Sequence, residues 1–191
     1  MLNNLEKYDV VLGSNSPRRR ELLSDMGVKF RVEAIKGIDE SYPASLPVEE
    51  IPVFLARVKA QGHPLSANEL LITADTVVVL DEAVLGKPLG NEDAHRMLRA
   101  LSGRAHRVIS GVCVTTANRT ESFSDTSVVH FAELTDEEID YYIEHYRPLD
   151  KAGAYGIQEW IGNIGISGIN GDFYNVMGLP TRKLYQVLKS F

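Results

Sequence analysis

Cysteine is nearly absent from this chain of 191 residues, because Cys113 is the only one. A single cysteine excludes an internal disulfide framework and any zinc site built from several thiolates. Cys113 lies between Val112 and Val114 in an apolar run. We therefore expect a buried structural thiol there, and no nucleophile.

Long apolar runs and an excess of positive charge are also missing. No run approaches the roughly 20 residues of a membrane-spanning helix, and the first residues lack the apolar core of a signal peptide. We expect a soluble cytoplasmic protein with no membrane partner. With 20 Lys and Arg against 26 Asp and Glu, the net charge is −6. That balance argues against a nucleic-acid partner held through phosphates, but it leaves room for a local basic pocket that binds a small anion.

Several catalytic motifs do not occur. The sequence has no GxxxxGK[ST] phosphate loop, no HExxH zinc motif and no GxSxG nucleophile elbow. Hydrophobic residues make up 44% of the chain, which is enough for a packed core. The length and the lack of a long linker predict one domain over residues 1–191.

Apolar periodicity and turn signals predict an α/β fold with a mixed sheet. Ser16 followed by Pro17 marks a helix start, and Thr135 with Glu138 forms a capping box. We expect a last helix after Pro180 and a short strand pair turned by Asn170-Gly171. The other expected strands are 8–13, 28–35, 70–80 (interrupted at 74–76), 83–85, 107–115 and 120–133, and the other expected helices are 17–26, 52–61, 91–101 and one from 135.

The segment from Ser14 to Arg19 is the first candidate site. A helix N-terminus offers unpaired N–H groups to an anion, and Ser14 and Ser16 add hydroxyl donors. Arg18 and Arg19 stand in the first turn, where positive charge is unfavourable for the helix itself. This breach of a local rule favours a phosphate-binding function, although a solvated charged turn is the plain alternative.

Asp75 is the second candidate. It interrupts the apolar stretch 70–80, and a carboxylate there must be paired, hydrogen-bonded or bound to metal. Its alternative role is to cap a local turn at the end of a strand. Lys59 and Lys87 are isolated cations that could equally be solvated surface charges.

The stretch Lys151–Gln158 contains small residues that let backbone approach a ligand, and the Gln158 amide can read a base edge. An ordinary Gly-rich connection is the alternative.

These segments together resemble the Maf family of nucleotide pyrophosphatases, in the order of that family from about Val10 to Leu188. The loop ending at Gln158 is similar to the branch that acts on dTTP and UTP. Just beyond it, Glu159–Gly162 departs from the small Gly-rich continuation of that pattern. The matched motifs are S-x-S-P-R-R at 14–19, A-D-T at 74–76, K-P at 87–88, K-A-G-A-Y-G-I-Q at 151–158 and M-G-L-P at 177–180.

The resemblance implies a mixed twisted sheet flanked by helices, with two lobes around a deep cleft, as in inosine-triphosphate pyrophosphatases. It also implies a homodimer. Asp75 would be the proton acceptor, with Glu40 and Asp75 as ligands of Mg²⁺ or Mn²⁺. The residues implied for substrate choice are Arg18, Thr76 and Gln158, and those implied for triphosphate binding are Arg19, Lys59 and Lys87.

The implied reaction is attack of water on the α-phosphorus of dTTP or UTP, which gives a monophosphate and pyrophosphate. An aspartate with a pKa of about 3.9 is a weak base for water with a pKa of about 15.7, so a divalent ion is expected to assist. Two alternatives stay open: the same reaction on a modified or purine nucleotide, and a regulator of cell division that binds nucleotide without hydrolysis.

Overall fold

The structure, a computed structural model, describes residues 2–191 and has the mixed α/β fold that the sequence predicts. The strands are β1 (Asp9–Leu12), β2 (Arg31–Val32), β3 (Glu69–Leu80), β4 (Ala83–Leu85), β5 (Ala105–Thr115), β6 (Thr120–Phe131) and β7 (Ile166–Asn170). The α-helices are α1 (Pro17–Asp25), α2 (Ile51–Gln61), α3 (Asn91–Leu101), α4 (Asp136–Tyr146), α5 (Trp160–Gly165), α6 (Phe173–Met177) and α7 (Thr181–Leu188). Short 3-10 helices are η1 (Asn3–Lys7), η2 (Pro148–Asp150) and η3 (Ala152–Ala154).

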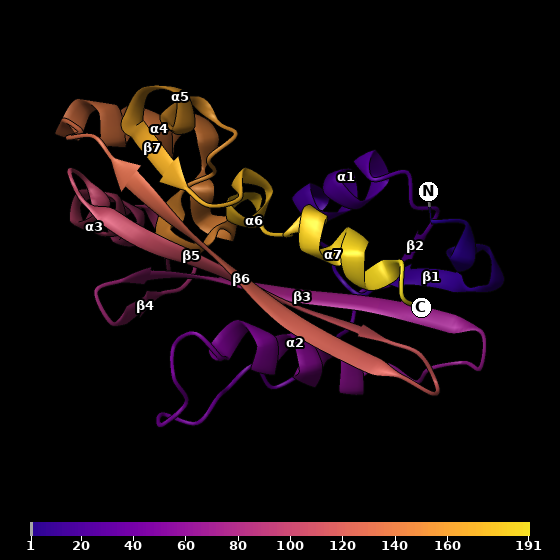
Figure 1. The fold of residues 1–191 in the computed structure, drawn as a ribbon. Helices are drawn as coiled ribbons and strands as arrows, with labels where there is room; N and C mark the ends of the chain where they lie inside the picture. Colours follow the sequence, from indigo (N-terminus) through magenta and orange to yellow (C-terminus); the bar gives the residue numbers. More distant parts are fainter. Residues whose placement is uncertain (1) are drawn as a thin grey trace. The chain divides into compact units, whose positions relative to one another are not determined.

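The strands form one seven-stranded sheet in the order β2-β1-β3-β5-β6-β7, with β4 paired to β3 beside this path. β1 is parallel to β2 and to β3, whereas β4 is antiparallel to β3 and β7 is antiparallel to β6. The mixed sheet is therefore confirmed. Figure 1 shows the length of β3, β5 and β6, each of which contributes residues to both compact units of the chain.

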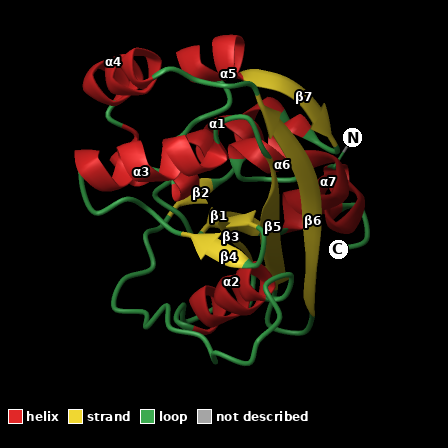
Figure 2. Ribbon diagram, turned by 90° about the vertical axis from the view of Figure 1, so that its left-hand side faces the viewer, coloured by secondary structure: helices red, strands yellow, loops and turns green. Residues whose placement is uncertain are grey.

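Among the described residues, unit 1 comprises 2–76, 110–125 and 178–191. Helix α2 lies on one side of β1 and β3, and α1 lies on the other (Figures 1 and 2). Ala56 and Ala60 on α2 pack against Val11, Leu71 and Cys113 of the strands. Burial raises the pKa of the Cys113 thiol, as expected for a structural cysteine.

Unit 2 comprises residues 77–109 and 126–177. Its core joins helices α3, α4 and α5 to the ends of the long strands, with Leu98, Tyr142 and Ile161 fully buried. The capping box predicted at Thr135 opens α4. Trp160 packs against this core.

Three local predictions are wrong. β3 runs from Glu69 to Leu80 without interruption, because the polar groups at 75–76 find partners: Asp75 meets Lys59 on α2, and Thr76 meets Ser110 on β5. The strand predicted over 28–35 shrinks to β2, which stands at the edge of the sheet with a single neighbour. Asn170-Gly171 does not turn a hairpin: β7 ends there and helix α6 follows.

Candidate active site

Lys59, Asp75 and Glu40 form one cluster in unit 1. Lys59 Nζ lies 2.7 Å from Asp75 Oδ1 and 3.2 Å from Glu40 Oε2. The Lys59 and Asp75 side chains are 15% and 14% exposed, while that of Glu40 is 56% exposed. The Lys59–Asp75 ion pair is therefore mostly buried, whereas Glu40, the second partner of Lys59, is largely exposed to solvent. This arrangement brings together three residues that the sequence analysis assigned to catalysis, phosphate binding and metal binding.

Secondary structure explains how these groups meet. Lys59 stands in the last turn of α2, and Asp75 stands in the middle of β3. Gly111 on β5 lets the start of α2 lie close, because a Cβ there would come within 2.2 Å of Val53 N and 2.3 Å of Pro52 C. Gly111 is not part of any matched motif, although a glycine inside a strand often marks a close backbone approach.

Arg19 lies beside the strand that carries Asp75. Its guanidinium donates to Ala74 O at 2.8 Å, to Gly178 O at 2.9 Å and to Thr76 Oγ1 at 3.1 Å. Burial lowers the pKa of Arg19, and the charge of Asp75 opposes that shift. With three donors committed to protein oxygens, Arg19 joins α1, β3 and the chain before α7. Its binding of triphosphate stays a prediction.

Thr76 has a second partner that the sequence analysis missed. Its hydroxyl lies 2.8 Å from Ser110 Oγ and 3.4 Å from Gly178 O. Ser110 is a buried polar residue in the apolar run 108–114, the same signal that drew attention to Asp75. Gly178 has a φ of +115°, which disfavours any other residue at this corner.

The N-terminus of α1 has the expected form. Ser16 caps the helix by accepting from Arg19 N, and Pro17 is the first helical residue. Ser14 Oγ accepts from Ser16 N at 3.2 Å. Arg18 is half-buried in the first helical turn. The predicted residues Ser14, Ser16, Arg18, Arg19, Glu40, Lys59, Asp75 and Thr76 thus all belong to unit 1.

Glu40 and Asp75 were also predicted to hold a divalent metal. Mg²⁺ in phosphate-processing sites commonly takes one or two carboxylates together with substrate oxygens. Both carboxylates converge on the position of one cationic group, Lys59 Nζ, and both are oxygen donors. The donor set therefore fits a metal that shares its ligands with substrate. Within residues 2–191, no group of three or more His, Cys, Asp or Glu side chains could hold a metal ion.

Lys87 and Gln158 belong to unit 2. The segment before Lys87 contacts the loop that leads to Gln158, because Gly153 N donates to Gly86 O at 3.1 Å. A side chain at Gly153 would meet Val78, and its φ of +68° also favours glycine. Within unit 2, the K-P motif therefore lies beside the K-A-G-A-Y-G-I-Q motif.

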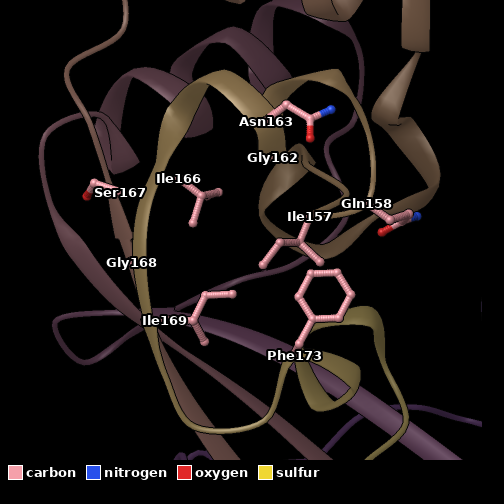
Figure 3. Close-up of a pocket in the computed structure, with 9 residues that line it drawn as sticks. All are labelled: Ile157, Gln158, Gly162, Asn163, Ile166, Ser167, Gly168, Ile169 and Phe173. Atoms are coloured by element: carbon pink, nitrogen blue, oxygen red, sulfur yellow. The ribbon is translucent and has the colours of Figure 1, made fainter.

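Gln158 is exposed and lines a pocket of about 530 Å³. Figure 3 shows apolar side chains in this pocket, with the amide of Asn163 at one rim and the ring of Phe173 at another. The complete lining is Ile157, Gln158, Gly162, Asn163, Ile166, Ser167, Gly168, Ile169 and Phe173. A pocket that combines apolar side chains with amide groups suits a flat ring with polar edges.

Similar proteins agree with this reading of the motifs. A dTTP/UTP pyrophosphatase of Phocaeicola vulgatus is 56% identical over 191 residues, which cover 99% of this chain and 99% of that protein. Another, from Porphyromonas gingivalis, is 56% identical over 195 residues, which cover 100% and 98%. A dTTP/UTP pyrophosphatase of Cytophaga hutchinsonii is 47% identical over 191 residues, which cover 98% and 86%.

Among solved structures, a HAM1 protein from Coxiella burnetii matches with a TM-score of 0.55 over 96% of this chain and 100% of that one. At 15% sequence identity the likeness concerns the fold alone. The family model described as Maf-like protein matches residues 9–191. Together with relatives of more than half identical sequence over almost its whole length, this match shows that the chain belongs to the Maf-like protein family.

Proposed function

We propose that this protein hydrolyses dTTP and UTP to the nucleoside monophosphate and pyrophosphate. The observation that carries the proposal is the cluster in which Lys59 contacts both Asp75 and Glu40, near the start of an Arg-bearing helix. The names of relatives that are 47–56% identical support the substrate class. A preference for dTTP and UTP over other nucleoside triphosphates goes beyond hydrolysis of a triphosphate as such, and the substrate panel below tests it.

The substrate carries roughly four negative charges near neutral pH, because each of its three phosphates carries one and the terminal phosphate ionises a second time near pH 6. Lys59, Arg18 and the N–H groups at the start of α1 would stabilise that charge. Ser14 and Ser16 would add neutral donors. This explains how a chain with a net charge of −6 can bind a polyanion.

In the reaction, a water oxygen attacks the α-phosphorus while the bond from that phosphorus to the bridging oxygen of the β-phosphate breaks. Asp75 accepts the proton of the water, and pyrophosphate leaves with the bridging oxygen. Lys59 orients the Asp75 carboxylate through Oδ1. Glu40 and Asp75 would hold Mg²⁺ or Mn²⁺, which when bound lowers the pKa of coordinated water.

Substrate choice would involve Thr76, Arg18 and Gln158. Gln158 would read the base edge through one amide donor and one acceptor, and Lys87 would contact the triphosphate. The pocket beside Gln158 offers apolar surface to a pyrimidine ring. A homodimer and a cytoplasmic location stay predictions. In the part of the chain that the structure describes, every helix is too short or too polar to cross a membrane.

The deciding experiment measures pyrophosphate release from a panel of ordinary and modified triphosphates, with Mg²⁺, with Mn²⁺ and with chelator. We expect dTTP and UTP to be the best substrates. Asp75→Asn keeps the shape but removes the base, and should lower kcat about 10²- to 10⁴-fold. Asp25→Asn, at the exposed end of α1, makes the same charge change and should be active.

Parental activity in Asp75→Asn would exclude Asp75 as the base. A preference for purine or modified triphosphates would correct the substrate while keeping the reaction. Tight nucleotide binding with no pyrophosphate release under any metal condition would instead identify a regulator that does not hydrolyse its ligand.

A further inference from the structure

Gln158 stands in a tight turn whose two ends are tied together. Glu159 N donates to Gly156 O at 3.0 Å, which closes a turn with Ile157 and Gln158 at its centre. Helix α5 follows directly, and Gly162 N donates to Glu159 O at 2.9 Å. The direction of the Gln158 side chain therefore depends on how this turn is held.

One buried hydroxyl contacts both ends of the turn. Tyr142 Oη, on α4, accepts from Gly156 N at 3.0 Å and donates to the Glu159 carboxylate. A tyrosine hydroxyl has one proton to donate and can accept through its lone pairs, so both roles are chemically consistent. The side chain of Tyr142 is fully buried. Burial and the hydrogen bond to Glu159 raise the pKa of Tyr142, which keeps the donating proton in place.

A lysine completes the arrangement. Lys151 Nζ lies 3.0 Å from Glu159 Oε1 and 2.8 Å from Asp150 Oδ1, and its side chain is only 9% exposed. Gly156 leaves room for this ion pair, since a Cβ there would lie 2.9 Å from Glu159 Cδ and 3.0 Å from Lys151 Cε. The carboxylate of Glu159 thus receives a hydroxyl from α4 and an ammonium from the start of the same loop.

We propose that Glu159 is a positioning residue for base recognition, which fixes the Gln158 turn through Tyr142 and Lys151. The inference rests on the proposed function and deepens it, because it names the residues that make Gln158 selective. An amide distinguishes bases only when its donor and acceptor are held in one orientation. A displacement of about 1 Å at such a contact can cost about 100-fold in rate. Glu159 and Tyr142 themselves need not touch the nucleotide.

The test uses Glu159→Gln and Tyr142→Phe in the full-length protein. Glu159→Gln keeps the shape but removes the ion pair with Lys151. Tyr142→Phe removes both hydrogen bonds of the hydroxyl. We expect each to lower kcat/KM for dTTP and UTP about 10-fold, chiefly through a higher KM, and to lower kcat/KM for poorer triphosphates by less than about 2-fold. The preference for pyrimidines over other bases therefore narrows, an effect that a general loss of stability would not produce.

Matched controls lie on the same helix. Glu144→Gln makes the same charge change at an exposed position of α4, and Tyr146→Phe removes a hydroxyl from a partly exposed ring stacked on Tyr142. Both should keep the parental selectivity. Glu159→Gln is nearly isosteric and leaves the buried Tyr142 side chain in place, so it keeps the test valid should Tyr142→Phe not fold. Thermal unfolding of each variant shows that the protein assayed is folded.

Amide hydrogen exchange supplies a readout besides activity. Gly156 and Glu159 N–H groups should exchange at least 10-fold faster in Glu159→Gln than in the parental protein, while the amides of α3 keep their rates. Unchanged selectivity in both variants, with an active parental enzyme, would overturn the positioning role alone. A parental protein that hydrolyses no triphosphate would overturn the proposed function itself, so the two failures are distinguishable.

Discussion

Lys59 in unit 1 and Lys151 in unit 2 are both largely buried, and each contacts two carboxylates, one mostly buried and one exposed. For Lys59 the buried partner is Asp75 and the exposed one is Glu40. For Lys151 the buried partner is Glu159, and the exposed one is its chain neighbour Asp150. Judged by charge and burial alone, the two groups are nearly equivalent.

They differ in what else their carboxylates contact. Glu159 also accepts the hydroxyl of the fully buried Tyr142 and begins a helix, so its second oxygen is committed to the fold. Asp75 stands in a strand beside Thr76 and Ala74, which are tied to Arg19. The other contacts of the two carboxylates therefore decide whether such a lysine takes part in catalysis or only holds a loop in place. A buried ion pair alone is weak evidence for either role.

Replacing Lys59 and Lys151 in turn by an uncharged residue is the strongest test of whether Lys59 takes part in catalysis and Lys151 only supports the Gln158 loop. Lys59→Met should lower kcat/KM for dTTP about 100- to 1,000-fold, because it removes a cation that we assign to the reacting phosphates and to Asp75. Lys151→Met should lower it by about 10-fold or less. Pyrophosphate release measures both, with thermal unfolding as the check on folding. Equal losses in the two variants would contradict the distinction between them.

Acid should destabilise unit 2 through His106. His106 Nε2 lies 2.7 Å from Tyr155 Oη in the Gln158 loop, and burial lowers the pKa of His106 to about 4. The unfolded chain, with an ordinary pKa of about 6.5, binds a proton first as pH falls. Stability from this group is therefore complete above about pH 6.5 and is lost toward pH 4.

Between pH 7 and pH 5, the free energy of unfolding should thus fall about 2 kcal/mol more in the parental protein than in His106→Gln. Urea unfolding at each pH measures the difference. Parallel pH profiles for the two proteins would show that His106 is not the group responsible.

The N-caps of α1 and α4 give the smallest expected effect on stability, and they still distinguish the two helices by their effect on KM. Ser16→Ala and Thr135→Ala each remove an N-cap hydrogen bond and should lower the free energy of unfolding by about 1 kcal/mol. Only Ser16→Ala should also raise KM for dTTP, since Ser16 begins the helix that we assign to phosphate binding. Urea unfolding and pyrophosphate release on both variants test this. A comparable rise in KM in Thr135→Ala would mean that helix stability controls activity.

The sequence predicted the elements whose signals are local. The caps at Ser16 and Thr135 and Pro17 at a first helical position are all confirmed. The prediction of an interrupted β3 failed because a carboxylate in an apolar run looks disruptive when its partner is unknown. The hairpin at Asn170-Gly171 failed because the same turn residues also precede a helix.

Within the site, the motifs identified Asp75 and Thr76, and the family resemblance implied Lys59, but they did not identify Ser110 or the approach of α2 to Gly111. Nor did they identify the contact of Tyr142 with Gly156 and Glu159. These contacts join residues that are distant in the chain. A polar residue in an apolar run and a glycine within a strand mark Ser110 and Gly111, but no local pattern shows which residues they meet.

The amino-acid sequence by itself determined the helix starts, the strand periodicity, the acidic net charge and the family of this protein. Caps and propensities depend on neighbours within a few residues, and motifs retain their order along the chain. Only the tertiary structure decided that Lys59 meets Asp75 across 16 positions and that Glu159 meets Tyr142 across 17. Whether a charge is solvated or paired depends on which elements pack beside it, and packing is a property of the whole fold.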